Sequence, residues 1–417
     1  MGHTATEKMF ARKSGKKEVF PGDFVVCDAD LLFAHSLFNA RMQFDKIGGV
    51  KRVWNGDRVA FCIGHHMCLP SNTQDANAAQ LDREFAKKYG VRHLYDMGSG
   101  NGHILMLEEG HAYPGAIVPG GDSHSTIYGA VGGFGTAYPE LTEVLLTGKV
   151  WFKVPPTIRI NLESATRKGV CARDVGSYLL GYVVGADGGM WHTLDFGGTY
   201  THSLSIYQRM ILSLLAIEMG GVTGFIEPDD ITLDFVTPRA RFPFEVFLND
   251  PDCEFAQTFD VDVSKIEPLI SCPPRPGNVK PVSEVEGVKI DQAYIGGCTG
   301  SSLEDFKMAA EILRGRKLHP GTRLIIVPGT KNIIKQLQDE GLIGFFSEMG
   351  AIISPPYCGP CQMICYGHLA DGENMIGTHP RNLPGRGGSR SDVYLASPYT
   401  VAAAAITGKI TDPRAFL

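Results

Sequence analysis

The segment Ile295-Gly-Gly-Cys-Thr-Gly-Ser-Ser302 and its distant partner Pro355-Pro-Tyr-Cys-Gly-Pro-Cys-Gln-Met363 decide how the whole chain is interpreted. Cys298 follows two glycines, and Cys358 and Cys361 flank a Gly-Pro pair, so every thiol stands in a tight turn. A C-x-x-C pattern brings two sulfurs close enough to share one metal or cluster. The third cysteine, sixty positions upstream, then predicts a three-thiolate site.

The number of thiolates matters for the chemistry. A cubane iron–sulfur cluster needs a ligand for each of its four irons, so three cysteines leave one iron open to water or substrate. An open coordination position suits Lewis-acid chemistry. The alternatives are buried core cysteines, a zinc site and a redox-active C-x-x-C pair. Cys365 is expected to be a core thiol, because a fourth ligand would close the open iron.

Both segments resemble motifs of the aconitase superfamily, in particular its branch of 3-isopropylmalate dehydratase and homoaconitase large subunits. Those proteins read G-S-C-T-N, then C-G-P-C, then N-R-N-F-x-G-R, and the last motif here is Pro380-Arg-Asn-Leu-Pro-Gly-Arg386. The resemblance runs from Met1 to Leu417. It implies an α/β fold with the aconitase-like three-domain α/β/α architecture, lacking the swivelling fourth domain.

The composition limits the class of protein. At 417 residues the chain exceeds one ordinary core, and 43% apolar with 20% charged residues is typical of a soluble globular protein. A net charge of −6 argues against nucleic-acid binding, which needs a basic face. No apolar run is long enough for a membrane span, and ten cysteines without a signal-like segment favour a reducing cytoplasm.

Alternating strand-like and helix-like segments indicate parallel α/β layers, with functional groups at the ends of strands. The sequence pattern changes near residue 154, and residues 271–277 form a proline-rich linker. Together these features predict three domains, residues 1–156, 157–278 and 279–417. The glycine-rich segment 98–102 leads to a turn rather than to a long helix, so a dinucleotide site is not favoured. Helices are expected at Ala76–Tyr89, Pro139–Thr147, Ser205–Met219, Ser302–Arg314 and Thr330–Glu340.

Two arginines of the last motif predict carboxylate binding. Arg381 and Arg386 match the arginines of the superfamily's substrate-binding segment, and a guanidinium can bind a carboxylate through two hydrogen bonds. The alternative is that both are solvated surface arginines. Ser123, in the segment Asp122-Ser-His124, is also expected to contact the substrate.

Acid–base groups come from two further segments. Two segments resemble superfamily segments that form carboxylate–imidazole pairs around a departing hydroxyl. They are H-I-L-M-L-E-E-G, which starts at His103, and D-S-H, which starts at Asp122. Hydroxide leaves poorly, so it needs a metal and a proton from a well-oriented acid. The resemblance implies that His103 and His124 serve the leaving water and that Glu108 and Asp122 orient them. Glu218 matches a glutamate near the cluster water, and a helix-end carboxylate is its alternative.

Several positions depart from the family pattern. His35 and His66 are expected to bind substrate, but His65 stands where relatives place a carboxylate. Such groups orient ligands, so their loss predicts a changed substrate or, alternatively, lost activity. The pattern Cys62-x-x-His65-His66-x-Cys68 could hold zinc, although its spacing fits no common zinc module. Two departures, Phe38 and Leu214, are larger apolar side chains that are expected to reshape the pocket. The others are Ser36, Gly300, Gln362-Met363 and Pro380.

Together these features predict the large, catalytic subunit of an iron–sulfur hydro-lyase with one [4Fe-4S] cluster. It would reversibly dehydrate a small hydroxy di- or tricarboxylate of the alkylmalate type, such as 3-isopropylmalate. In the superfamily a serine of the swivelling domain removes the carbon-bound proton, so the resemblance implies a small partner subunit. The alternatives are a cluster-bearing regulatory or binding protein and an inactive paralogue. The acidic charge argues against an RNA-binding role.

Overall fold

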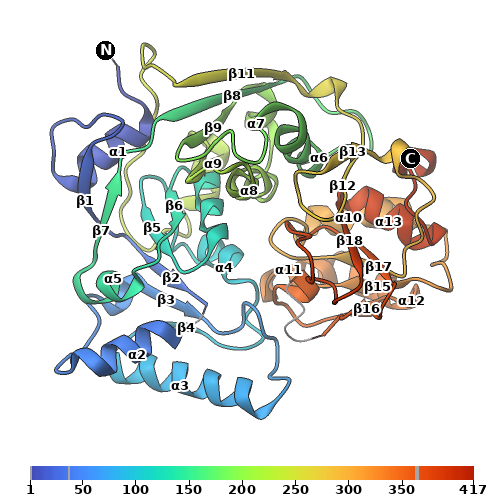
Figure 1. Cartoon of the computed structure of the whole chain (residues 1–417), viewed down its shortest axis with the longest axis horizontal. Coiled ribbons are helices and arrows are strands. Elements are labelled where there is room, and N and C mark those ends of the chain that lie inside the picture. The colour runs from blue at the N-terminus through green and yellow to red at the C-terminus, as the bar shows by residue number, and fades with distance from the viewer. Residues whose placement is uncertain (1, 36–37, 362–365) are drawn as a thin grey trace.

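The chain folds into three α/β units, each built on its own sheet (Figure 1). The computed structural model describes residues 2–35, 38–361 and 366–417, and for residues 38, 39 and 45 the backbone alone. Parallel strands with helices packed against them confirm the predicted α/β class. Within the described ranges, no helix is both long and apolar enough to span a bilayer.

The first sheet has five parallel strands in the order β4-β3-β2-β5-β6 and lies in the blue and teal part of Figure 1. Its central strands are buried along their whole length, as expected for a parallel sheet covered by helices. The strands are β2 (Leu32–Ala34), β3 (Val59–Cys62), β4 (His93–Tyr95), β5 (Ile117–Gly120) and β6 (Phe134–Ala137). The helices are α2 (Phe38–Ile47), α3 (Thr73–Tyr89), α4 (Gly102–Glu108) and α5 (Leu141–Thr147). Helix α1 (Ala5–Ser14) and an antiparallel ribbon of β1 (Phe24–Asp28) and β7 (Lys149–Lys153) complete the unit.

The second sheet is also parallel, in the order β10-β9-β8-β11. It lies at the top of Figure 1, between the other two units. Its strands are β8 (Thr157–Glu163), β9 (Thr193–Gly197), β10 (Thr223–Phe225) and β11 (Gln257–Asp262). Its helices are α6 (Ala172–Tyr178), α7 (Thr199–Ser203), α8 (Ile206–Leu215) and α9 (Asp230–Val236).

The third sheet has seven strands in the order β13-β12-β18-β17-β14-β15-β16, and its last five are parallel. Strand β12 pairs antiparallel with β13 and with β18, so residues before 278 already belong to this sheet. The domain limits at 156 and 278 stay predictions. The strands are β12 (Leu269–Ser271), β13 (Val279–Pro281), β14 (Gln292–Ile295), β15 (Arg323–Ile326), β16 (Ile352–Ile353), β17 (Asn374–Gly377) and β18 (Asp392–Ala396). The helices are α10 (Leu303–Leu313), α11 (Lys331–Asp339), α12 (Leu342–Glu348) and α13 (Pro398–Thr407).

Side-chain caps begin several of the predicted helices. Ser302 caps α10 in a capping box with Asp305, Thr330 caps α11, and Ser205 caps α8. These caps satisfy N–H groups that have no partner inside the helix. A continuous cluster of buried apolar side chains runs from Phe33 of the first sheet through the second and into the third. This shared core fixes the three units against one another.

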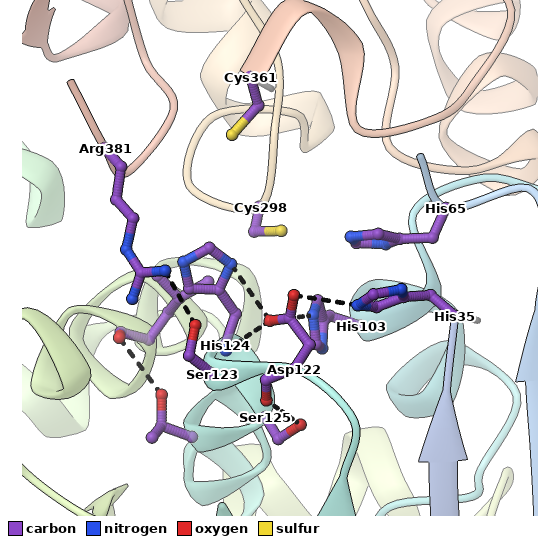
Figure 2. A network of polar contacts seen from close by, with 12 residues as sticks. His35, His65, His103, Asp122, Ser123, His124, Ser125, Cys298, Cys361 and Arg381 are labelled. Atoms are coloured by element: carbon purple, nitrogen blue, oxygen red, sulfur yellow. Dashed lines mark hydrogen bonds and ion pairs between the residues drawn. The ribbon is translucent and has the colours of Figure 1, made fainter. Parts of the chain in front are cut away.

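The carboxyl ends of the first and third sheets face each other. Strands β2, β3 and β5 are followed by His35, His65 and Asp122. Strands β14 and β17 are followed by Cys298 and Arg381, and Figure 2 shows these side chains converging. Ligands of open parallel sheets bind outside the carboxyl ends of strands, so this junction is the candidate site.

Candidate active site and metal centre

Three buried thiols meet at the edge of the third sheet. Cys298, Cys358 and Cys361 are each at most 4% exposed, and the sulfur atoms of Cys298 and Cys358 lie within 4.8 Å of each other. The neighbouring thiols raise the pKa of Cys358, and Cys358 lowers the pKa of Cys361. The structure thus brings the predicted cysteines to one region, and their role as metal ligands stays a prediction. Cys365 lies outside the described residues.

A glycine turn places the second and third thiols. Gly359 has a φ of +71°, and a Cβ atom there would lie 2.2 Å from the Tyr294 hydroxyl oxygen. Tyr294, in β14, donates its hydroxyl hydrogen to the Cys358 carbonyl at 2.7 Å. A side chain at 359 would therefore strain the backbone and displace this tyrosine.

Nitrogen donors surround the sulfurs. Asn101 Nδ2 lies 3.0 Å from Cys298 Sγ, and Arg386 Nη1 lies 3.6 Å from Cys361 Sγ and 3.1 Å from the Cys361 carbonyl oxygen. Positive groups and N–H donors favour thiolates over thiols. Buried thiols with such donors fit an iron–sulfur cluster, because its ligands must be thiolates held away from water.

Asp122 is the shared acceptor of the site (Figure 2). Its Oδ1 accepts from His103 Nε2 at 3.2 Å and from the backbone N–H of His124 at 2.6 Å, and its Oδ2 lies 3.2 Å from His35 Nε2. Burial alone would raise the pKa of Asp122, but His124 and the hydrogen bonds from His103 and His35 hold it well below its usual value. Asp122 is therefore ionised and orients the imidazoles around it.

The expected pairing of His103 with Glu108 is wrong. His103 donates to Asp122 and lies 3.4 Å from the Tyr128 hydroxyl, whereas Glu108 accepts from Tyr207 at 2.6 Å. Both residues lie in α4, where five steps turn the helix through about 500° and leave the side chains on different faces. The carboxylate partner of His103 is Asp122, in the segment that follows β5.

His124, Glu218, Arg381 and Ser123 form a second chain of contacts. Arg381 donates from Nε to Glu218 Oε1 at 2.5 Å and from Nη1 to Ser123 Oγ at 2.9 Å. His124 Nε2 lies 3.9 Å from Glu218 Oε1 and has no hydrogen-bond partner among the described residues. Burial lowers the pKa of His124 to about 3, and it raises the pKa of Glu218 despite Arg381. A neutral imidazole thus faces a carboxyl group that keeps its proton to a higher pH than usual.

His35, His65 and His66 pack against one another at the ends of β2 and β3. The ring of His66 lies 4.2 Å from His35 and 4.4 Å from His65, centre to centre. Burial lowers the pKa of His66 to about 3. The alternative zinc grouping is wrong, because Cys62 contacts the Gly100 carbonyl and Cys68 the Tyr366 hydroxyl instead.

The departures from the family pattern have different structural settings. Gly300 lies against Thr378, so that a Cβ atom there would be 2.2 Å from the threonine Cβ. Leu214 is fully buried in the apolar core, and its carbonyl accepts from Thr126 at 3.3 Å. It therefore does not line an open pocket as expected. Ser36, Gln362-Met363 and the side chain of Phe38 lie outside the described residues.

The sequence predicted no role for Asn101, and for His65 it offered only the alternative of a zinc ligand. Asn101 caps α4 by accepting from the N–H of His103 at 3.1 Å while its Nδ2 faces Cys298. An asparagine directly before a helix is a recognisable cap. Its contact with a cysteine 197 positions away has no sequence signal.

Comparisons with known proteins agree with this arrangement. The family model described as aconitase family (aconitate hydratase) matches residues 63–287 and 278–408. The chain is 38% identical to the 3-isopropylmalate dehydratase large subunit of Hydrogenobaculum sp. strain Y04AAS1, over 99% of this chain and 98% of that protein. It is 39% identical to 3-isopropylmalate dehydratase large subunit 1 of Methanopyrus kandleri over 100% of both chains. The chain therefore belongs to the aconitase family.

Proposed function

We propose that the chain is the catalytic large subunit of an iron–sulfur hydro-lyase that acts on 3-isopropylmalate or a close alkylmalate. Relatives that match over nearly the full length are named 3-isopropylmalate dehydratase large subunits. The aconitase family implies an iron–sulfur cluster, and a large subunit implies a small subunit as partner.

One observation carries the proposal. Ligand atoms of His103, His124 and Cys298 all lie within 4.8 Å of one another. The histidines come from the first unit and the cysteine from the third. Removing a hydroxyl group requires a Lewis acid and a proton donor at the same oxygen, and this convergence would place the metal that Cys298 helps to hold beside two imidazoles that can carry protons.

The cysteines define what the site would hold. Cys298, Cys358 and Cys361 would bind a [4Fe-4S] cluster, which supplies a Lewis acid through the iron that has no protein ligand. Asn101 and Arg386 donate toward two of these sulfurs.

The arginines would bind the substrate. Arg381 has a side chain 20% exposed, and its guanidinium already holds Glu218 and Ser123. A guanidinium offers five N–H donors in one plane, so Arg381 can bind a substrate carboxylate and keep its contact with Glu218. Arg386, at the end of the same loop, would bind a second carboxylate. Ser123 and the histidines His35 and His66 would complete the walls of the site.

The chain's own residues would handle one of the two protons. When the C–O bond breaks, its electron pair stays on oxygen, and the departing hydroxide takes a proton from the Glu218–His124 pair. Asp122 holds His103 and His124 in position for this step. The electron pair of the neighbouring C–H bond forms the double bond. Its proton goes to a base that the small subunit would supply.

Anaerobic purification with the small subunit of the same organism tests the proposal. Iron and sulfide are quantified, and the ultraviolet absorbance of the unsaturated product is followed with 3-isopropylmalate, other alkylmalates, citrate and homocitrate. The expected result is about four irons per chain and turnover of an alkylmalate. Cys358→Ala should lose iron and turnover together. Cys253→Ala is the control, because this cysteine lies beside Gly2, away from the other cysteines of the site.

The outcomes separate the candidate functions. Zinc, or no metal at all, in the purified chain would overturn the cluster and the proposed reaction. A full cluster without turnover of any tested acid would favour the cluster-bearing regulatory protein or the inactive paralogue. Turnover of citrate alone would keep the hydro-lyase and change its substrate.

A further inference from the structure

His65 lies between the histidine group and the cysteines. Its side chain follows β3, is 1% exposed, and has a ring nitrogen within 4.8 Å of both Cys298 Sγ and Cys358 Sγ. Figure 2 shows the ring of His65 pointing toward Cys298. The His65 carbonyl also accepts the backbone N–H of Cys358 at 2.7 Å. Both the backbone and the ring of His65 therefore adjoin the proposed cluster ligands.

Helix α4 fixes the protonation of this ring. The backbone N–H of Gly102 donates to His65 Nδ1 at 3.0 Å. Gly102 is the first residue of α4, and N–H groups in the first turn of a helix have no partner within it. Because Nδ1 accepts this hydrogen bond, a neutral His65 carries its proton on Nε2.

A histidine beside two cysteines could be a metal ligand or a hydrogen-bond donor. As a ligand it would close the open iron, or complete a Cys3His zinc site. A metal-bound histidine donates its second ring N–H to a carboxylate or carbonyl. The second nitrogen of His65 accepts from an amide instead, and a protonated Nε2 has no lone pair for a metal.

We infer that His65 donates an Nε2–H hydrogen bond to the sulfur atoms of the cluster site and does not ligate the metal. The inference rests on the proposed cluster and deepens it, since it leaves the fourth iron open to substrate. An N–H aimed at sulfur stabilises the extra negative charge of a reduced cluster, so it raises the reduction potential. His65 is thus a residue that tunes the cluster.

The test uses the full chain, reconstituted anaerobically. His65→Leu removes the donor, and His65→Gln restores a side-chain N–H. His111→Leu is the matched control, because this buried imidazole contacts the Tyr95 hydroxyl at 2.7 Å rather than the thiols. Iron and sulfide are counted, and the midpoint potential is measured by redox titration with EPR detection. We expect His65→Leu to keep its iron with a lower midpoint potential, His65→Gln to lie closer to wild type, and His111→Leu to have the midpoint potential of wild type.

A second measurement needs no substitution. In the wild-type protein carrying isotope-labelled histidine, pulsed EPR should detect the weak nitrogen coupling of a hydrogen-bonded ring. The strong coupling of a directly bound nitrogen would overturn the inference, as would an unchanged midpoint potential in His65→Leu with full iron content. A wild-type chain that binds no cluster would overturn the proposed function as well, so its iron content distinguishes the two failures.

Discussion

The protonation of the site depends on one carboxylate. Asp122 accepts from His103, lies beside His35 and His124, and is only 11% exposed. The sequence predicted Asp122, its neighbours His103 and His124, and the three cysteines, because each of these residues stands in a short recognisable motif. It paired His103 with Glu108 incorrectly, because closeness along a helix does not put two side chains on one face.

Asp122→Asn tests this role. The amide cannot hold the imidazoles as an ionised carboxylate does, so we expect kcat to fall by about 10²–10⁴-fold, the usual contribution of acid–base groups. The iron content should be unchanged. Asp57→Asn, at an exposed carboxylate paired with Arg92, is the control. A kcat equal to wild type would remove Asp122 from the mechanism.

Arg381→Lys tests the substrate arginine. Lysine keeps the charge but loses the planar fork that holds Glu218 and Ser123. Loss of a charged hydrogen bond worth about 1.5–3 kcal/mol should raise KM by about 10–100-fold. Arg390→Lys is the matched control, since Arg390 has a side chain 79% exposed in the same loop. Equal KM values in the two variants would contradict the assignment.

Secondary structure could be predicted where caps and apolar periodicity agree. Helices α3, α8, α10 and α11 lie where they were expected, each opened by a capping side chain. Helix α4 was missed, because its glycine-rich start is typical of a turn. A contact from another unit fixes it, since the Asn101 N–H donates to the Gly329 carbonyl at 2.7 Å. Such a distant partner leaves no local pattern.

Gly300→Asn tests whether the family's usual residue fits this chain. Thr378, which would meet the new side chain, is itself fixed by hydrogen bonds to both backbone groups of Gly296. Overpacking at this point should lower the free energy of unfolding by about 1–3 kcal/mol. Urea denaturation measures it, with Gly344→Asn as control, because position 344 has open space. An unchanged free energy of unfolding would contradict this, because it would show that the segments of Gly300 and Thr378 can move apart to accept the new side chain.

Asp229→Asn tests the link between α8 and α9. Arg209 of α8 is fully buried and donates to Asp229 at 2.8 and 2.6 Å. Burial alone would raise the pKa of Asp229, but the hydrogen bonds from Arg209 and the Thr232 N–H hold it well below its usual value. Near neutral pH the variant should lose about 3–5 kcal/mol, because it leaves a buried charge unpaired.

The pH dependence of that loss has a definite sign. The folded-state pKa of Asp229 is lowered, so its stabilisation is complete above the ordinary carboxyl pKa and is lost as pH falls toward the folded value. The gap in unfolding free energy between wild type and Asp229→Asn should therefore narrow below about pH 4. Asp230→Asn, at the exposed neighbouring position, should show no such gap. A gap that widens in acid would contradict the ion pair.

At the scale of the molecule, the site exists because two sheets present their carboxyl ends to each other (Figure 1). The sequence predicted three α/β units and the residues at their strand ends. It could not predict that β2, β3 and β5 would face β14 and β17, because strand order and docking depend on distant contacts. The contacts of Asn101 and His65 with the cysteine segments arise only from this docking.

The proposed function requires three thiols that hold a cluster whose remaining iron faces the histidines and is free to bind substrate. Mössbauer spectroscopy of the chain reconstituted with isotope-enriched iron, recorded before and after addition of 3-isopropylmalate, tests this arrangement. We predict that the signal of one iron of the four separates from the others and shifts when the substrate binds. Four iron signals that do not change with substrate, or a chain that takes up no iron, would contradict the proposed cluster and its open iron.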